Sequence, residues 1–491
     1  RTIAFWQGIL KNGIDIAVPE AKVNDAFKAN LIYDLIARNK VGNNYIQTVN
    51  DFQYHAFWLR DASFIVHMYE VSGYPEYAQQ VLNFFAGWQH PDGNFLSQSG
   101  QFDGVGLVLW AYGQHYQFTH DRKFADEVFP SVVKAVAWIK QARQGDPLHL
   151  LPYTTPGDNE AISGHITGHN FWALDGLKNA VILAKATGHQ KEAGEFLHEY
   201  EDYRATFIKV LDQVTKKTGG YIPSALDGQH DGQDWGNMLS VYPEIVLPPH
   251  DPMVTATLNA TRAKYAEGIM TYDDGRFLHD YLTFKNTETE TVRGDQKLAV
   301  GELYATLLHT SSTHGGFETS IRPWGDRDFG SNLSPHGWYA AEYRIALRNM
   351  MVRKQGSDLH LFSVISPEWI QTGNEIRVAN APTNFGTVDF SLQALSTTQA
   401  RMTFHASFVT VPKRIILHLP WFMRTNSVTV DGQRLATINN EVILPLNVKT
   451  IHIDWKKLPD AEPMSYRRTV AQYKAEYAKR YQQFLRTGGD Q

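Results

Sequence analysis

The sequence predicts a mainly helical toroid followed by a C-terminal antiparallel β-sandwich. Three observations support this prediction. Residues 1–355 contain about ten segments whose apolar residues recur with the period of an α-helix. The connections between these segments alternate between short and long. From residue 359 onwards the pattern changes to short β-branched runs bounded by turn residues.

The helical part is rich in Ala and Leu, and most of its segments carry apolar residues at i, i+3, i+4 and i+7. We expect helices over residues 21–38, 60–72, 75–88, 104–118, 121–143, 167–187, 190–215, 251–267, 298–311 and 335–352.

The loops between these helices fall into two classes. Three connections are short, at residues 72–75, 119–121 and 187–189. Four others are long and rich in Gly, Trp, Asp and His: 89–103, 144–166, 216–250 and 312–334. Antiparallel helical hairpins in a ring would place all short turns at one end and all long loops at the other, where functional residues usually gather. A superhelical repeat protein is the alternative, but the sequence has no fixed repeat period.

The C-terminal part contains short strand-like runs, with a turn signal at Asp431-Gly432. Strands are expected at 359–364, 376–378, 387–392, 400–408, 413–419, 427–430, 442–445 and 450–453. A charged helix over 466–485 has Tyr, Lys and Arg spaced for packing back on the body. The expected domains are therefore a helical domain at 1–355, a β-sandwich at 356–458 and a helical tail at 459–491.

Bulk properties exclude several classes of function. The net charge is −5 and no long basic run occurs, so nucleic acid is not an expected partner. The chain has no cysteine, which excludes thiolate catalysis and disulfides. No apolar run reaches ~18 residues, so no membrane span is expected. Residue 1 is Arg and no signal-peptide pattern is present, so we expect a mature or trimmed form. The compartment stays open, with a periplasmic or secreted location slightly favoured over a cytoplasmic one.

The most informative motif is residues 57–63, Phe-Trp-Leu-Arg-Asp-Ala-Ser, read together with Gln101-Phe102-Asp103-Gly104. Each segment places charged or amide groups beside an aromatic ring where a helix is expected to begin. Aromatic faces cover the C–H side of a sugar, while Arg, Asp and Gln bind its hydroxyls. The candidate sugar-binding residues are Trp58, Arg60, Asp61, Gln101 and Asp103. An Arg–Asp pair that merely caps a core helix is the structural alternative.

His165 and His169 are four residues apart, a spacing that can bind zinc at a helix start. The Glu of an HExxH-type motif is absent, so we predict no metal and no other cofactor. We expect His169 to contact the ligand instead.

Two carboxylates lie in long loops that lead into helices. Glu160 is in the loop before the helix at 167–187, and Glu318 precedes the Arg322-Pro323-Trp324 loop. A pair of this kind could cleave a glycosidic bond, one carboxyl donating a proton and the other activating water. Taken singly, each Glu could equally be a solvated loop residue. Arg322 and Trp324 are further candidates for sugar binding.

The order of these elements resembles the glucoamylase family of inverting glycosidases, which fold as (α/α)6 barrels. In that family a Trp-Arg-Asp motif opens an early helix and holds hydroxyls of the terminal sugar. Trp58, Arg60 and Asp61 match it with a one-residue offset at Leu59, and residues 101–104 match a second element.

The resemblance implies that Glu160 is the general acid and Glu318 the general base, with Trp338 in the Trp-rich final barrel helix. The match covers about residues 20–355. Two departures are evident. The family's Trp-Glu-Glu acid segment is not reproduced around Glu160, and the β-sandwich follows the barrel, whereas bacterial relatives usually carry it in front.

The predicted function is an exo-acting, inverting glycosidase that releases a terminal sugar, glucose or a similar one, from an oligosaccharide. Three alternatives stay open. A disaccharide phosphorylase would bind phosphate through Thr319, Ser320, Arg322 and His336. A polysaccharide lyase would use Tyr339 and His336 for proton removal, with Arg322 and Arg327 neutralising a uronate. A non-catalytic glycan-binding protein would need the aromatic residues but neither Glu160 nor Glu318.

Overall fold

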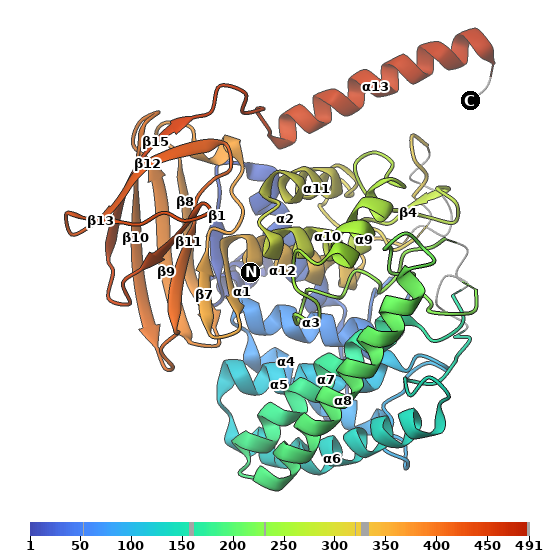
Figure 1. Cartoon of the computed structure of the whole chain (residues 1–491). Coiled ribbons are helices and arrows are strands. Elements are labelled where there is room, and N and C mark those ends of the chain that lie inside the picture. Colours follow the sequence, from blue (N-terminus) through green and yellow to red (C-terminus); the bar gives the residue numbers. More distant parts are fainter. Residues whose placement is uncertain (53, 157–161, 230–231, 320, 326–332, 489–491) are drawn as a thin grey trace.

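The structure, a computed structural model, describes residues 1–52, 54–156, 162–229, 232–319, 321–325 and 333–488. A helical ring forms one part of the molecule, and two β-sheets lie against one side of it (Figure 1). The predicted combination of a helical toroid and a C-terminal β-sandwich is confirmed. Among the described helices, none combines the length and apolar character needed to cross a bilayer.

Five helices form the inner wall of the ring, and nearly all their residues are buried. They are α3 (Leu59–Ser72), α5 (Asp103–Thr119), α7 (Thr167–Ala186), α10 (Asp280–Arg293) and α12 (Gly337–Met351). A helix buried on all sides must lie inside its neighbours.

The outer helices bury mainly one face, except α11 (Gln296–Leu308), in which residues 302–307 are all buried. The others are α2 (Ala21–Ile36), α4 (Pro75–Phe85), α6 (Arg122–Gly145), α8 (Gln190–Thr215) and α9 (Pro252–Arg262). Their apolar residues recur along that face, as expected for helices between core and solvent.

The alternation of short and long connections is confirmed. Residues 73–74, 120–121, 187–189 and 294–295 lead from an inner helix to the next outer helix. Long loops lead back to the next inner helix, so the N-termini of the inner helices all face the long-loop end of the ring. A short 3-10 turn, η1 (Ala86–Trp88), and the strand pairs β2 (Arg38–Val41) with β3 (Asn44–Gln47) and β4 (Thr271–Tyr272) with β5 (Phe277–Leu278) belong to these connections.

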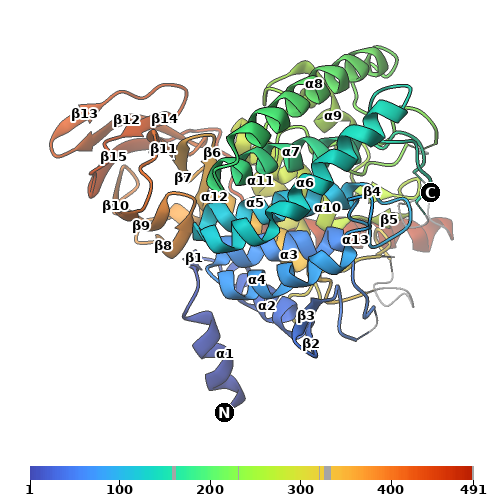
Figure 2. The same ribbon diagram turned by 90° about the horizontal axis from the view of Figure 1, so that it is seen from below.

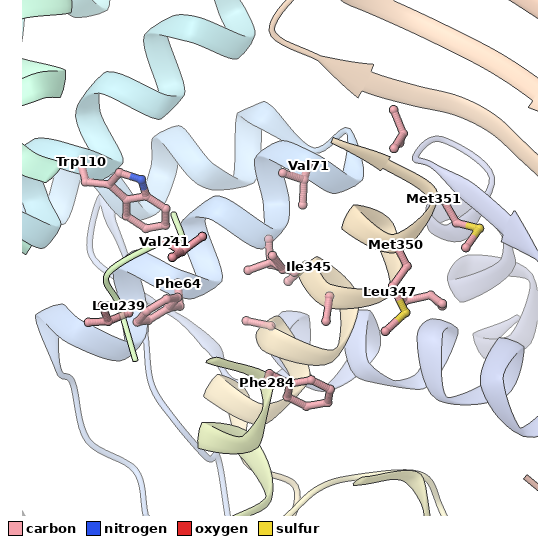
Figure 3. Packing of buried hydrophobic residues seen from close by; sticks show 14 of the residues in the cluster. Phe64, Val71, Trp110, Leu239, Val241, Phe284, Ile345, Leu347, Met350 and Met351 are labelled. Atoms are coloured by element: carbon pink, nitrogen blue, oxygen red, sulfur yellow. The ribbon is translucent and has the colours of Figure 1, made fainter. Parts of the chain in front are cut away.

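One inner position holds no helix. Between α7 and α10 the buried segment 234–247 runs without regular structure through the place where a sixth inner helix would stand. Its Leu239 and Val241 lie in the core near Phe64 and Trp110 (Figure 3). This segment lies within the long loop predicted at residues 216–250.

The helix α10 was not predicted. Its sequence, Asp-Tyr-Leu-Thr-Phe-Lys-Asn-Thr-Glu-Thr-Glu-Thr-Val-Arg, is polar and rich in threonine, so it lacks the apolar stripe of an ordinary buried helix. Its Thr and Asn side chains instead bond within the ring: Thr287 donates to Glu302 and Asn286 donates to Thr261. Tertiary hydrogen bonds therefore add to the packing of its few apolar residues, among them Leu282 and Phe284.

The β region comprises a seven-stranded sheet of order β1-β8-β9-β10-β15-β12-β13 and a four-stranded sheet of order β14-β11-β7-β6. The pairing is antiparallel except between β7 and β11. Their bounds are β1 (Asp15–Ala17), β6 (Val352–Gln355), β7 (Asp358–Leu361), β8 (Glu375–Thr383), β9 (Gly386–Ala394), β10 (Gln399–Phe408), β11 (Arg414–His418), β12 (Met423–Val430), β13 (Gln433–Leu435), β14 (Glu441–Leu444) and β15 (Thr450–Lys457), with a 3-10 turn η2 (Pro367–Ile370) between β7 and β8. The two sheets share one core, in which the rings of Phe362 and Phe390 are 5.0 Å apart.

The sheets and the ring are joined more closely than the expected boundary between residues 355 and 356 implies. That boundary falls inside the hairpin formed by β6 and β7. In addition, β1 comes from the N-terminal segment and pairs with β8 at the edge of the large sheet.

Helices at both termini extend from the body. The helix α1 (Thr2–Leu10) projects away at the N-terminal end (Figure 2). The C-terminal α13 (Tyr466–Thr487) has no buried residue. Its first half contacts the body, where Tyr473 stacks on Trp324 at 5.1 Å, whereas Phe484 and Leu485 near its end are exposed. The expected packing of this helix against the body therefore holds up to Arg480, which lies over the Trp324 ring, and not for its exposed end.

Candidate active site

The long-loop end of the ring collects charged residues from the first turns of the inner helices. Arg60 at the start of α3 donates from Nε to Asp103 Oδ2 at the start of α5, at 2.6 Å. His169 at the start of α7 lies 3.7 Å from the other Asp103 oxygen. Three residues predicted from separate motifs thus form one buried cluster.

The electrostatics of this cluster follow from burial and from Arg60. Burial raises the pKa of Asp103, but Arg60 and His169 outweigh it and leave that pKa below its ordinary value. Burial lowers the pKa of His169 to about 4, with Asp103 acting in the opposite direction. Near neutral pH the cluster therefore contains an ion pair and a neutral imidazole.

Trp235 covers this cluster. The Arg60 guanidinium carbon lies 4.2 Å from the centre of the Trp235 ring, within the range of a cation–π interaction. Trp235 belongs to the irregular segment 234–247, which approaches α7 closely at Gly236 and Gly168. A Cβ atom at Gly168 would lie 2.9 Å from the Gly236 Cα. Glycine at both positions lets the tryptophan reach Arg60.

A second cluster surrounds His336, the residue before α12. Its Nε2 lies 3.7 Å from Asp61 Oδ1 and 3.8 Å from Glu318 Oε2. Burial lowers the pKa of His336, but Glu318, Asp61 and Asp280 outweigh it and raise that pKa above its ordinary value. The fold therefore brings Asp61, from the early motif, next to Glu318, from a loop more than two hundred and fifty residues later.

Asp280 supports the loop that carries Glu318. It accepts hydrogen bonds from the backbone N–H of Phe317 at 2.9 Å and of Tyr281 at 2.8 Å. Burial raises its pKa to about 6 in spite of these bonds. The Phe317 bond anchors the residue immediately before Glu318.

Aromatic rings form the floor of the site. The Trp338 ring lies 5.0 Å from Tyr281 and 5.1 Å from Phe64, on which it stacks. Below it, Glu342 accepts from Trp338 Nε1 at 2.8 Å and from the Lys285 ammonium. Although Arg344 and Arg348 lie on the same helix as Glu342, its partner is Lys285 of α10.

The other predicted residues divide into three groups. Trp58 precedes α3 and contacts the Tyr54 ring at 4.7 Å, and Gln101 is buried just before α5, so both lie at this end of the ring. Arg322 follows Ile321, whose backbone forms an isolated β-bridge with Leu278. Leu278 lies two residues before Asp280. Glu160 lies outside the described residues. Pro156, the last described residue before Glu160, packs against Gly100, which is next to Gln101 in the sequence.

Trp324 is not brought together with the other predicted residues. Its ring stacks on Tyr473 and lies 4.4 Å from the Arg480 guanidinium carbon, both in α13. Its backbone N–H donates to Glu267. The structure thus places Trp324 in a contact between the ring and the C-terminal helix.

His165 does not share a helix face with His169, because α7 begins at Thr167. Its ring bonds to Asp227 at 2.7 Å and to Asp146 at 2.8 Å, which ties two long loops together. In the parts of the chain that the structure describes, no group of three or more His, Asp or Glu could hold a metal ion.

Sequence reasoning gave Asp280, Tyr281 and Trp235 no role. The His279-Asp280-Tyr281 run before a polar segment was a usable signal, since Asp favours the first turn of a helix. Trp235 carried no comparable signal, because only the tertiary fold brings it over Arg60.

Comparison with known proteins clarifies the fold. No protein-family model matches the chain. Solved structures similar to it include a bacterial glucoamylase complexed with acarbose, with a TM-score of 0.54 and 16% identity over 70% of this chain and 58% of that one. The α-L-rhamnosidase of Dictyoglumus thermophilum covers 91% of this chain with a TM-score of 0.63 and 13% identity, while this chain covers 50% of that one. The chain has the fold of the glucoamylase-like glycosidases.

Two further matches agree with this glucoamylase-like fold. A glycosidase solved in complex with glucose matches 68% of this chain and 99% of its own, with a TM-score of 0.54 and 14% identity. In sequence, an uncharacterised glycosyl hydrolase of Methanocaldococcus jannaschii is 25% identical over 150 residues. That match spans 28% of this chain and about a quarter (24%) of the relative's length.

Proposed function

We propose that this protein is a glycoside hydrolase. The observation that carries the proposal is the convergence, at one end of the ring, of the Arg60–Asp103–His169 cluster with the Asp61–His336–Glu318 cluster. Charged groups that bind hydroxyls stand there beside the ring faces of Trp235, Tyr281 and Trp338. That combination suits a sugar, whose edge is polar and whose face is apolar.

The names of the structurally similar proteins support the same class of ligand. Their structures include complexes with glucose, acarbose and, for the α-L-rhamnosidase of Streptomyces avermitilis, L-rhamnose. We infer a neutral terminal sugar as the substrate group. Arg60 and Asp61 would bind its hydroxyls, and Trp235 would cover one of its faces.

We further propose an inverting mechanism with Glu318 as the general base and Glu160 as the general acid. In an inverting enzyme the base activates a water molecule on one face of the sugar while the acid protonates the leaving oxygen on the other. His336 lies within 4 Å of both Glu318 and Asp61 and would hold the two side chains in place. The carboxyl groups of Glu160 and Glu318 should then be about 6.5–9.5 Å apart, the separation that admits water.

Exo action is supported by the closed floor of the site. Phe64, Trp338 and the Lys285–Glu342 pair fill the ring below the two clusters. A sugar chain would therefore enter with one end, and only the terminal unit would reach Glu318.

Proton NMR of the protein with α- and β-linked disaccharides, with and without phosphate, tests the proposal. We expect one glycoside to release a free sugar whose first anomer is opposite to the original linkage. Glu318→Gln and Glu160→Gln should each lower kcat by at least about a hundredfold, since acid–base catalysis typically contributes 10²–10⁴-fold. Glu195→Gln, the same change on the exposed face of α8, is the matched control and should leave kcat unchanged.

Other outcomes would overturn parts of this proposal. A sugar 1-phosphate formed only with phosphate would identify a phosphorylase and remove Glu318 as the base. Release of the retained anomer would exclude inversion. Sugar binding without turnover, unchanged in Glu318→Gln, would identify a glycan-binding protein.

A further inference from the structure

A second cavity lies at the opposite end of the ring, between its inner helices and the β-sheets. Its volume is about 210 Å³. The C-terminal halves of α3, α5, α7 and α12 line it, together with residues 241–245 and the strand β6. Arg348, in this wall, is ten residues beyond Trp338 along α12, which corresponds to ~15 Å at 1.5 Å per residue. The cavity is therefore separate from the candidate active site.

The cavity wall carries more basic than acidic side chains: its basic residues are Lys178, Arg348, Arg353 and Lys354, and its acidic residue is Glu244. Lys178 pairs with that Glu244 at 2.7 Å. Lys354, in contrast, donates to the amide oxygen of Gln117 at 2.6 Å.

The two arginines also bond to neutral groups. Arg348 donates to Asn349 Oδ1 at 3.0 Å and to the Pro382 carbonyl at 2.8 Å. Arg353 donates from Nε to the Ser363 hydroxyl at 2.9 Å. Three buried or half-buried cations thus have no carboxylate bonded to them among the described residues, an arrangement that is costly unless an anion compensates it.

Several buried polar nitrogen atoms also belong to the wall. Arg348 Nε, Trp110 Nε1 and His67 Nδ1 have no hydrogen-bond partner within the described residues. Arg348 is 4% exposed, Trp110 1% and His67 7%, so open solvent does not satisfy them. Buried polar groups of this kind normally have a partner, which in a cavity is a ligand or water.

Glu288, a buried acid on α10, acts electrostatically on Arg348 and Arg353 but forms no ion pair with either of them within the described residues. It accepts from Asn349 at 3.1 Å, and burial together with the neighbouring Glu342 raises its pKa to about 8. It is therefore largely protonated at neutral pH.

We propose that this cavity binds a small oxyanion, a phosphate or carboxylate group, held by Arg348 and Lys354. Guanidinium and ammonium groups form strong charge-assisted hydrogen bonds to such oxygens. Trp110 Nε1 supplies a further donor. The site is independent of the proposed glycosidase activity, because none of its residues belongs to the two clusters at the other end of the ring.

Isothermal titration calorimetry with inorganic phosphate, and separately with acetate, tests the proposal at constant ionic strength in a chloride background. We expect saturable binding of at least one of the two anions. Lys354→Met and Arg348→Met should each weaken it at least tenfold. Lys297→Met, on the exposed face of α11 where Lys297 pairs with Glu462, is the matched control and should bind as the parent does.

The two probes separate the sources of the anion. If phosphate binds and acetate does not, the anion of this site is a phosphate group. If acetate binds, it is a carboxylate group. No saturable heat with either anion would overturn the proposal, as would equal affinity in the parent and Lys354→Met.

A crystal of the parent soaked in selenate provides a test that needs no variant. An anomalous peak between Arg348 and Lys354 supports the site, and its absence there at saturating selenate contradicts it. Glu318→Gln should keep parental anion affinity, so failure of the glycosidase proposal and failure of this one give different results.

Discussion

Arg60 is buried, at 5% exposure, and its charge is balanced by Asp103 and by the face of Trp235. A buried ion pair offsets the cost of desolvation only while both partners are present. This pair therefore shapes the site and constrains the stability of the ring at the same time.

Asp103→Asn should destabilise the protein because it leaves the Arg60 charge buried without its carboxylate. We expect a loss of ~3–5 kcal/mol in the free energy of unfolding, measured by urea denaturation. Asp126→Asn, which breaks the exposed Arg122–Asp126 pair on α6, should cost less than ~1 kcal/mol. Equal losses in the two variants would show that Asp103 has no special role.

Glu288→Gln should alter the dependence of stability on pH. The folded-state pKa of Glu288 is about 8, above the ordinary value of 4.5, because burial and Glu342 disfavour its charge. Its contribution to stability is thus complete below about pH 4.5 and is lost as the pH rises towards 8. The parent should lose stability over this window faster than the variant does.

Urea denaturation of both proteins at several pH values between 5 and 8 measures this difference. The glutamine keeps an oxygen for the Asn349 hydrogen bond, so the two folds should be the same. If the free energies of unfolding of the two proteins changed with pH in parallel, the raised pKa of Glu288 would be contradicted.

At the scale of elements, close approach between inner helices depends on small residues. Gly106 of α5 and Gly176 of α7 face each other, and a Cβ at Gly176 would lie 2.8 Å from the Gly106 Cα. A Cβ at Gly106 would collide with the backbone carbonyl of Trp172. Since α5 and α7 carry Asp103 and His169 at their first turns, their separation sets the geometry of the first cluster.

Gly106→Ala should force α5 and α7 apart and destabilise the protein by ~1–3 kcal/mol, the usual cost of overpacking. Gly194→Ala, within α8 and facing open space, is the matched control. It should stabilise the protein by ~0.5–1 kcal/mol, because alanine is the better helix former. Thermal unfolding measures both changes, and a stabilised Gly106→Ala variant would show that the helices adjust freely.

For the whole molecule, the division into domains stays a prediction, but the structure shows how closely the parts are joined. A single buried apolar cluster extends through the ring and both sheets. The large sheet takes β1 from the N-terminal segment, and the small sheet takes β6 directly from the end of α12.

We therefore expect scanning calorimetry to record one cooperative unfolding transition for the whole chain, since the ring and the sheets share buried surface. A fragment of residues 356–458 lacks β1 and β6 and should not fold alone. Two separate transitions, or a folded fragment by circular dichroism, would show that the sandwich is an independent domain.

Much of the architecture was predictable because it depends on local patterns. Apolar periodicity located most helices of the ring, and the alternation of loop lengths located the end at which we propose the active site lies. Trp58, Arg60, Asp61 and Gln101 were recognisable for the same reason, since their motifs are short and lie at helix starts.

Local sequence patterns therefore suffice to predict the ring, the sandwich and the early motif that we propose binds sugar. Only the tertiary structure decided that α10 is a buried helix and that residues 234–247 replace an inner one, because hydrogen bonds and contacts distant in sequence stabilise both. It also decided that His336 lies beside Asp61 and Glu318, while Trp324 packs on α13. No local sequence pattern indicates that these residues are close in space, since their proximity depends on how the ring closes.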